Sequence, residues 1–257
     1  MQDDRPFSST GRPWREERFS LQVGGRAVPG IAWFPPRACA GLVLACHGGS
    51  GHKESPAVLA IRDRLLPEGH AVAAIDGPVH GDRRADGSRD PGAARADFRA
   101  AWRNGAARDD MTEDWRAFLD ALLARPALSG CPVGYIGVSM GTAYGLPYLA
   151  QDGRVRAAVL GLWGTSYPAS EHLAPAARRV RASVWFTQQW DDEIFDRAGV
   201  AELFDAIGSR DKRLVAYPGP HLELAGERLE DAAAFLVKRL HAASQPAAGR
   251  PSSMEPG

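Results

Sequence analysis

Long apolar runs are missing from this sequence of 257 residues, and so is an excess of charge of either sign. No run approaches the ~20 apolar residues that a membrane-spanning helix needs, so we expect no transmembrane segment. The first 14 residues contain no apolar core of the kind found in signal peptides, so we also expect no secretory leader. With 31 basic and 31 acidic residues, the formal net charge is +0. Nothing global therefore indicates a nucleic-acid or membrane partner.

Cysteine and lysine are both scarce. The three cysteines, Cys39, Cys46 and Cys131, are odd in number and lack CxxC spacing, which argues against a disulfide framework. Cys46 and Cys131 lie in apolar runs that suit buried thiols, so we expect a reducing, cytoplasmic location. Only three of the 31 basic residues are lysines. Arginine and alanine are abundant instead, which indicates a genomic base-composition bias rather than a binding surface.

Short apolar segments alternate with helix-like segments along most of the chain. The expected strands are FSLQV and AVPGIAWF within residues 19–34, followed by residues 41–48, 70–78, 131–139, 155–164, 182–190 and 213–221. The expected helices are residues 55–66, 110–124, 141–150, 196–207 and 227–240. The later strands are apolar almost throughout, as in a parallel sheet that is covered on both faces. This alternation predicts one α/β domain over residues 15–241, a doubly wound, mostly parallel sheet of about eight strands with helices on both faces. Residues 1–14 and 242–257 are polar or rich in small residues, and we expect them to be flexible.

A single serine stands between two glycines in GYIGVSMGTAYG, residues 134–145. The segment before it is an expected strand, and the segment after it is an expected helix. A direct turn from strand to helix would strain the backbone at Ser139, and Gly137 and Gly141 would relieve crowding across that turn. The hydroxyl would then lie at a helix N-terminus, which favours developing negative charge. The pattern predicts a nucleophile; the alternative is a turn whose small residues only allow close packing.

A nucleophilic serine needs a base, and the base needs a group that orients it. Of the seven histidines, only His47 and His221 lie directly at the end of an expected strand, and the place of His221 before the last helix favours it as the base. Asp191 and Asp192 follow the expected strand 182–190. Because the carboxyl ends of parallel strands meet at one edge of the sheet, these side chains should lie near the serine. Either aspartate could instead cap the next helix.

The order Ser…Asp…His, each after a successive late strand, resembles the α/β-hydrolase fold. The match runs from about residue 19 to residue 241, which is most of the chain. In that family the acid usually stands in a pattern like GxxDxxV. QQWDDEIF fits it with Asp192 as the acid and Phe195 as the apolar residue, although Gln189 replaces the glycine. The resemblance therefore favours Asp192 and leaves Asp191 open.

Two further loops extend the resemblance. DGPVHG, residues 76–81, resembles the DxPxHG loop of dienelactone-hydrolase-like and peptidase-like members. The loop HGGSGHKES follows an expected strand, and its first three residues resemble the family's HGG oxyanion motif. The resemblance implies an oxyanion hole formed by the N–H of Met140 and that of Gly49, with Gly48 as the alternative. His47 would order this loop. Dienelactone hydrolases themselves use a cysteine where this chain has Ser139, so the likeness favours the fold and the esterase branch over that lactone substrate.

Residues 81–108 carry seven arginines together with Phe98 and Trp102. They predict either a small cap whose arginines hold an acidic substrate, or a solvated helix with its two aromatic side chains buried. Tryptophans at strand ends are further candidates for pocket walls. The candidate substrate-binding residues are His47, Gly48, His80, Trp102, Trp163 and Trp190.

These residues together predict a serine hydrolase that cleaves carboxylic esters through an acyl-enzyme. Its substrate would be a small acyl compound, with no metal or organic cofactor and with no nucleic acid or membrane as a partner. A thioesterase, a lactone or C–C hydrolase, and a non-catalytic binding protein of the same fold remain alternatives. A metal site formed by His47, His52 and His80 is a weaker alternative, since no metal-binding spacing supports it. The sequence is compatible with a range of acyl lengths and with a homo-oligomer.

Overall fold

A single sheet of eight strands forms the centre of the molecule. The computed structural model describes residues 14–105 and 108–244, so the termini predicted to be flexible lie almost wholly outside the described residues. The strands are β1 Arg15–Val23, β2 Arg26–Phe34, β3 Gly41–Ala45, β4 His70–Ile75, β5 Val133–Ile136, β6 Val155–Gly161, β7 Ser183–Gln189 and β8 Lys212–Tyr217. Their order in the sheet is β1-β2-β4-β3-β5-β6-β7-β8. β2 pairs antiparallel with β1 and β4, and the remaining pairs are parallel. The prediction of about eight mostly parallel strands is confirmed.

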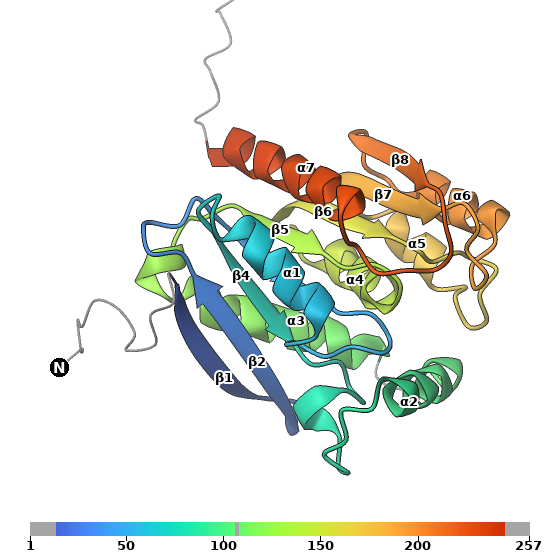
Figure 1. Ribbon diagram of the computed structural model, residues 1–257, viewed down its shortest axis with the longest axis horizontal. Coiled ribbons are helices and arrows are strands. Elements are labelled where there is room, and N and C mark those ends of the chain that lie inside the picture. The colour runs from blue at the N-terminus through green and yellow to red at the C-terminus, as the bar shows by residue number, and fades with distance from the viewer. Residues whose placement is uncertain (1–13, 106–107, 245–257) are drawn as a thin grey trace, which may run out of the picture.

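Helices cover both faces of the sheet (Figure 1). On one face lie α1 Pro56–Leu65 and α7 Glu227–Ser244. On the other lie α3 Arg108–Leu123, α4 Met140–Gln151, α5 Leu173–Ala177 and α6 Arg197–Ala206. Two short 3-10 turns, η1 Gly81–Arg83 and η2 Pro126–Leu128, occur in the connections. The five helices expected from the sequence are all present, with ends that differ by at most four residues from the expected ones.

The sheet separates two apolar layers. The layer under α3 and α4 contains Trp115, Phe118 and Tyr148, all fully buried. The layer under α1 and α7 contains Leu65 and Leu236, also fully buried. Burying each such side chain contributes about 1.5–3 kcal/mol, so the packing on both faces holds the strand ends in fixed positions.

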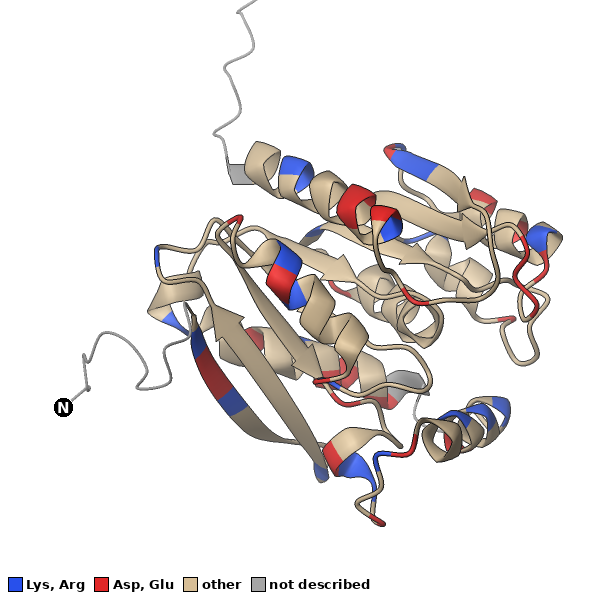
Figure 2. Cartoon of the chain, in the orientation of Figure 1, with Lys and Arg blue, Asp and Glu red and all other residues tan. Residues whose placement is uncertain are grey.

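Charged residues are concentrated on the edge strands β1 and β8 and on the outer faces of the helices (Figure 2). Charges on an edge strand oppose pairing with a second sheet. Within the described residues, no helix combines the length and apolar character needed to cross a membrane.

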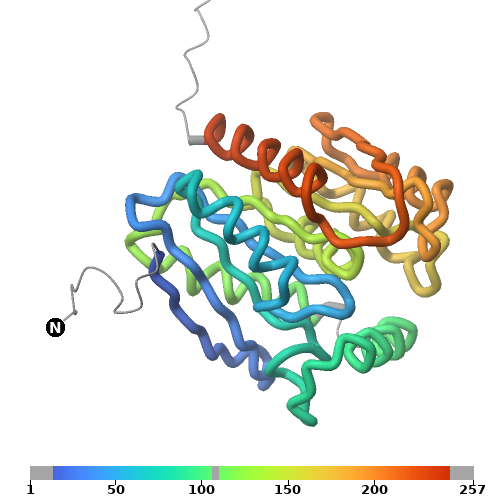
Figure 3. The backbone as a smooth tube through the Cα atoms, viewed as in Figure 1, coloured from blue at the N-terminus to red at the C-terminus, as the bar shows by residue number. Residues whose placement is uncertain are grey.

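One helix, α2 Pro91–Arg103, stands apart from the two helical layers. The backbone trace places it beyond the ends of the parallel strands, next to the loops that follow them (Figure 3). Asp90 caps its N-terminus by accepting a hydrogen bond from the Ala93 N–H at 2.6 Å. Phe98 and Trp102 form its buried face. The segment expected to be a cap or a solvated helix is therefore a helix beside the edge of the sheet where ligands bind in this class of fold.

Candidate active site

Ser139 occupies a sharp turn between β5 and α4. Its backbone has φ 56° and ψ −121°, a conformation that costs free energy for a residue with a side chain. A Cβ added to Gly137 would lie 2.9 Å from the Cβ of Cys46 and 3.1 Å from the Cα of Gly141. A Cβ added to Gly141 would lie 3.2 Å from the Cys46 carbonyl oxygen. Both flanking glycines are thus required by the close approach of the backbone, as the sequence predicts.

The side chains of Ser139, His221 and Asp192 form a continuous hydrogen-bonded chain. His221 Nε2 lies 3.1 Å from Ser139 Oγ, and His221 Nδ1 lies 2.9 Å from Asp192 Oδ2. The other carboxylate oxygen of Asp192 accepts the N–H groups of Ile194 at 2.8 Å and Phe195 at 3.0 Å. These backbone donors fix the carboxylate, so that it in turn fixes the histidine ring.

The environment of Asp192 keeps it ionised. Burial raises its pKa, but the hydrogen bonds from His221 and the two backbone N–H groups outweigh burial and hold the pKa below its ordinary value. Asp191, the alternative acid, lies on the surface and accepts the Gly219 N–H at 3.1 Å. The structure brings Asp192, and not Asp191, to the histidine. A residue that sequence reasoning missed, Glu193, accepts the backbone N–H of His221 at 2.9 Å.

Gln189, which replaces the family's glycine, ties down the loop that carries the histidine. Its side-chain amide donates to the Leu222 carbonyl at 2.8 Å and accepts the Leu222 N–H at 2.6 Å. Because Leu222 follows His221 directly, this pair of hydrogen bonds fixes the backbone next to the histidine. The departure from the family pattern therefore has a structural role.

His47 holds the loop after β3 in place. Its Nε2 accepts the Gly77 N–H at 3.0 Å, so the proton is on Nδ1, which donates to the Gly48 carbonyl at 2.8 Å. Burial keeps the pKa of His47 well below its ordinary value, so the ring is neutral. Since the peptide bonds are trans, the Gly49 N–H points away from the Gly48 carbonyl and from His47. Gly48 itself contributes its carbonyl to this arrangement and does not line the pocket.

A second buried histidine supports the next residue of the same loop. His80 Nε2 lies 3.0 Å from the Gly49 carbonyl and acts as the donor, because a carbonyl can only accept. Burial lowers the pKa of His80 as well. Met140 is the first residue of α4, and its backbone N–H has no hydrogen-bond partner within the described residues. Gly49 lies on the pocket wall near Ser139, so both predicted oxyanion donors come from the same region.

A buried ion pair joins the two loops that carry these histidines. Asp76 is fully buried and accepts both the backbone N–H of Lys53 at 2.8 Å and its Nζ at 2.7 Å. The Asp76 oxygen that accepts from Lys53 Nζ, Oδ2, also accepts the Asp82 N–H at 2.9 Å. Breaking a buried pair of this kind leaves an uncompensated charge, so the pair locks the loop after β3 to the loop after β4. Lys53 was not recognised from the sequence, where it reads as an ordinary loop residue.

A cavity of about 240 Å³ opens over Ser139. One part of its wall is aromatic, formed by Phe98, Trp163, Tyr167 and Phe195. Trp163 was expected there, and it packs 4.7 Å from the rings of both Tyr167 and Phe195. The remaining lining residues are Gly49, Ser50, Arg95, Arg99, Val138, Ser139, Leu162, Glu193, Ile194, His221, Leu222 and Glu223.

Two tryptophans expected in the wall lie elsewhere, and this corrects the sequence prediction. Trp102 is fully buried behind the wall, where it packs on Trp163 at 5.0 Å and donates to the Pro168 carbonyl. Trp190 is 53% exposed, with the Arg197 guanidinium 4.4 Å above its ring. Trp190 lies in the turn just beyond the end of β7, past the part of that strand that is buried on both faces. His47 and His80 also lie behind the wall and act on the loop rather than on the cavity.

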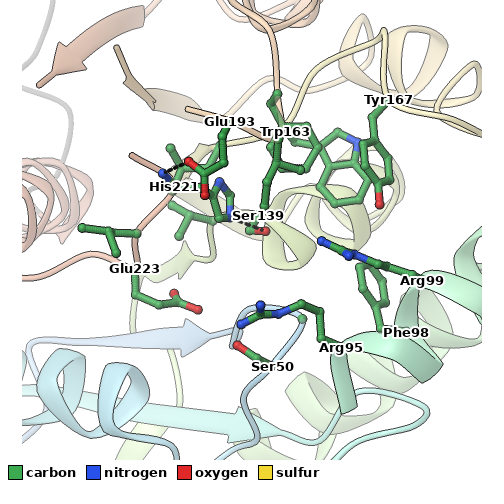
Figure 4. Close-up of a pocket in the computed structure, with 16 residues that line it drawn as sticks. Ser50, Arg95, Phe98, Arg99, Ser139, Trp163, Tyr167, Glu193, His221 and Glu223 are labelled. Carbon is green, nitrogen blue, oxygen red and sulfur yellow. Dashed lines mark hydrogen bonds between the residues drawn. The ribbon is translucent and has the colours of Figure 1, made fainter. Parts of the chain in front are cut away.

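Two of the arginines in residues 81–108 reach the cavity. Arg95 and Arg99 lie one turn apart on α2 and line it, opposite Glu193 and Glu223 (Figure 4). Most of the others have structural partners, such as Arg84, which pairs with Asp86 and Asp97. Each of the two interpretations of this segment is therefore correct in part. Its aromatic face is buried, as in the solvated-helix interpretation, and two of its arginines face the cavity, as in the cap interpretation.

The geometry does not favour a metal site at His47, His52 and His80. Both ring nitrogens of His47 are engaged by backbone groups. Across residues 14–105 and 108–244, no three His, Cys, Asp or Glu side chains are arranged to hold a metal ion.

The fold and the site can be compared with known proteins. No protein-family model matches the chain, and no curated protein does. Among solved structures, the PEG-bound complex of a cold-adapted esterase from an Arctic intertidal metagenomic library is 34% identical, with 92% of this chain and 98% of that chain covered and a TM-score of 0.80. A dienelactone hydrolase from Anabaena variabilis is 21% identical over 90% of this chain and 99% of that chain, with a TM-score of 0.65. A dienelactone hydrolase-like promiscuous phosphotriesterase from metagenomic libraries is 17% identical over 90% and 99%, with a TM-score of 0.69. The last two share the fold, and the first shows the family: this chain belongs to the α/β-hydrolase superfamily, in its esterase branch.

Proposed function

We propose that this protein is a serine hydrolase that cleaves carboxylic esters. The observation that carries the proposal is the hydrogen-bonded chain from Ser139 through His221 to Asp192, with separations of 3.1 and 2.9 Å. The kinship with an esterase at 34% identity supports the same reaction class. We also propose a reducing, cytoplasmic location, which the three free cysteines support.

In the proposed mechanism, Ser139 Oγ attacks the ester carbonyl while His221 Nε2 accepts its proton. Asp192 holds the ring with Nδ1 protonated and stabilises the imidazolium that forms. The N–H groups of Met140 and Gly49 stabilise the oxyanion. His221 then donates the proton to the leaving alkoxide, which departs as the alcohol and leaves an acyl-enzyme. Water, deprotonated by His221, hydrolyses the acyl-enzyme and restores the serine.

The loops around the triad suit this mechanism because they are preorganised. His47 and His80 hold successive carbonyls of the oxyanion loop, so the Gly49 N–H needs no rearrangement when negative charge develops. We propose that α2 acts as a small cap over the cavity, since Phe98, Arg95 and Arg99 from this helix line it.

The test is the turnover of p-nitrophenyl butyrate by the wild type and by Ser139→Ala. We expect kcat to fall by about 10⁴-fold or more in the variant. Near-full activity of Ser139→Ala would contradict the mechanism. A parallel assay with butyryl-CoA separates an esterase from a thioesterase, and a higher kcat/KM for the thioester would replace the proposed reaction by thioester hydrolysis on the same triad.

A further inference from the structure

The cavity over Ser139 has two unlike sides. Aromatic rings, including Trp163 and Tyr167, form one side (Figure 4). The other side carries polar side chains from three separate segments, namely Ser50, Arg95 and Glu223 (Figure 4). The mechanism described above assigns no role to these three polar side chains.

Glu223 borders both the catalytic histidine and the oxyanion loop. It lies two residues after His221, and a Cβ added to Gly48 would overlap its Oε1. Its carboxyl forms no hydrogen bond or ion pair with any of the described residues. Burial raises the pKa of this carboxyl, while the nearby charges of His221 and Arg95 act in the opposite direction. An acceptor group in such a position is available to a ligand.

Arg95 faces Glu223 from the opposite wall. The two charged groups point toward each other across the cavity (Figure 4), and the charge of Arg95 opposes the rise in the Glu223 pKa. Within the described part of the chain the Arg95 guanidinium has no hydrogen bond or ion pair, so the two groups are too far apart to bond directly. A donor and an acceptor of opposite charge are thereby held apart, with the hydroxyl of Ser50 beside them.

The chemistry of the proposed reaction indicates which part of the substrate meets this side. His221 must donate its proton to the leaving oxygen, so the alcohol part of the ester lies next to His221. Glu223 follows His221 in the same loop and lies on the side of Ser139 away from Trp163 and Tyr167 (Figure 4). The acyl part then faces the aromatic rings, and the alcohol part passes between Glu223 and Arg95.

We propose that the preferred substrates are esters whose alcohol part carries further hydroxyl groups, such as esters of small polyols, with Glu223 accepting from these hydroxyls and Arg95 and Ser50 donating to them. A hydroxyl both donates and accepts, so it satisfies facing groups of opposite charge. A group with a single charge would pair with one wall only and would leave the opposite charge without a partner. The inference rests on the proposed ester hydrolysis and names the substrate class for that same site.

The experiment compares two butyrate esters, 2,3-dihydroxypropyl butyrate and propyl butyrate. Each kcat/KM is divided by the rate constant for alkaline hydrolysis of the same ester, which removes the difference in leaving-group reactivity. We expect a wild-type preference of about tenfold or more for the dihydroxypropyl ester, since hydrogen bonds to charged groups in a partly exposed site are worth about this much. In Glu223→Leu and in Arg95→Met, the preference should fall toward about one. Glu223→Gln keeps an acceptor and should keep part of the preference.

Arg103→Met provides the matched control. Arg103 lies on the same helix, two turns beyond Arg95, but it is exposed and does not line the cavity, so its loss should leave the preference unchanged. A wild-type preference near one, or a preference that survives both Glu223→Leu and Arg95→Met, would overturn the inference while leaving ester hydrolysis intact. Failure of the wild type to hydrolyse either ester would instead reject the proposed function. Arg95 is an exposed helix residue, so its variant answers the question even if Glu223→Leu folds poorly.

Discussion

The catalytic histidine and the two loop histidines lie near one another but have opposite surroundings. His221 keeps 16% of its side chain exposed and bonds to a carboxylate and a hydroxyl. His47 and His80 are 1% and 0% exposed, bond only to backbone groups, and have lowered pKa values because of burial. A ring beside a carboxylate can become charged during a reaction, whereas a buried ring without one stays neutral. The same residue type therefore transfers protons in one place and holds a loop in the other.

The largest effect on kcat is expected when the carboxylate beside His221 is removed, because this change takes away the feature that distinguishes His221 from His47 and His80. We expect Asp192→Asn to lower kcat by about 10³–10⁴-fold, because the amide neither selects the reactive tautomer nor stabilises the imidazolium. The matched control is Asp191→Asn, which changes the neighbouring, exposed residue and should cost less than about threefold, as surface substitutions commonly do. Steady-state kinetics with p-nitrophenyl butyrate measures both. Equal losses in the two variants would contradict the assignment of Asp192.

A smaller loss of kcat is expected for His80, which only holds the oxyanion loop in place. His80→Leu should lower kcat about 10- to 100-fold with little change in KM, since the Gly49 peptide loses its support and the oxyanion is less well stabilised. His80→Gln can still donate a hydrogen bond to the Gly49 carbonyl, so it should recover part of the loss. Kinetics of both variants, with thermal melts to exclude unfolding, makes the measurement. If the two variants lose kcat equally, His80 does not act through that hydrogen bond.

The smallest effect concerns stability rather than rate. The pKa of Asp192 is lowered in the folded protein, so its contribution to the free energy of unfolding is fully present above the ordinary aspartate pKa of about 3.9. It is lost as the pH falls through the lowered value. The stability advantage of the wild type over Asp192→Asn should therefore shrink as the pH drops below about 4. Urea unfolding at a series of pH values tests this, and an advantage that is independent of pH would contradict it.

The sequence predicts those parts of the site that depend on local order. Ser139 is recognisable because the turn itself needs Gly137 and Gly141. His221 and Asp192 follow strand ends, and the parallel sheet brings those ends together. The same holds for residues 110–124, where apolar residues recur at the spacing of one helix face and are all fully buried in the structure, namely Met111, Trp115, Phe118, Leu119 and Leu122.

Other parts depend on contacts between distant segments and were not predictable. The direction in which α2 presents Arg95 is set by the packing of Phe98 and Trp102 on Tyr144 and Trp163. No local sequence pattern predicts that packing, so the arginine-rich segment was compatible with both a cap and a solvated helix. For the same reason Trp102 was placed in the wall instead of behind it. Glu223 could have been suspected only from its place two residues after His221.

The account depends most on Ser139 being an activated nucleophile. A fluorophosphonate probe reacts with such a serine, and intact mass with peptide mapping identifies the site. We predict one adduct on the peptide that carries Ser139 in the wild type and none in Ser139→Ala. A folded wild-type protein that gains no adduct, or one that is labelled at another residue, would contradict the account.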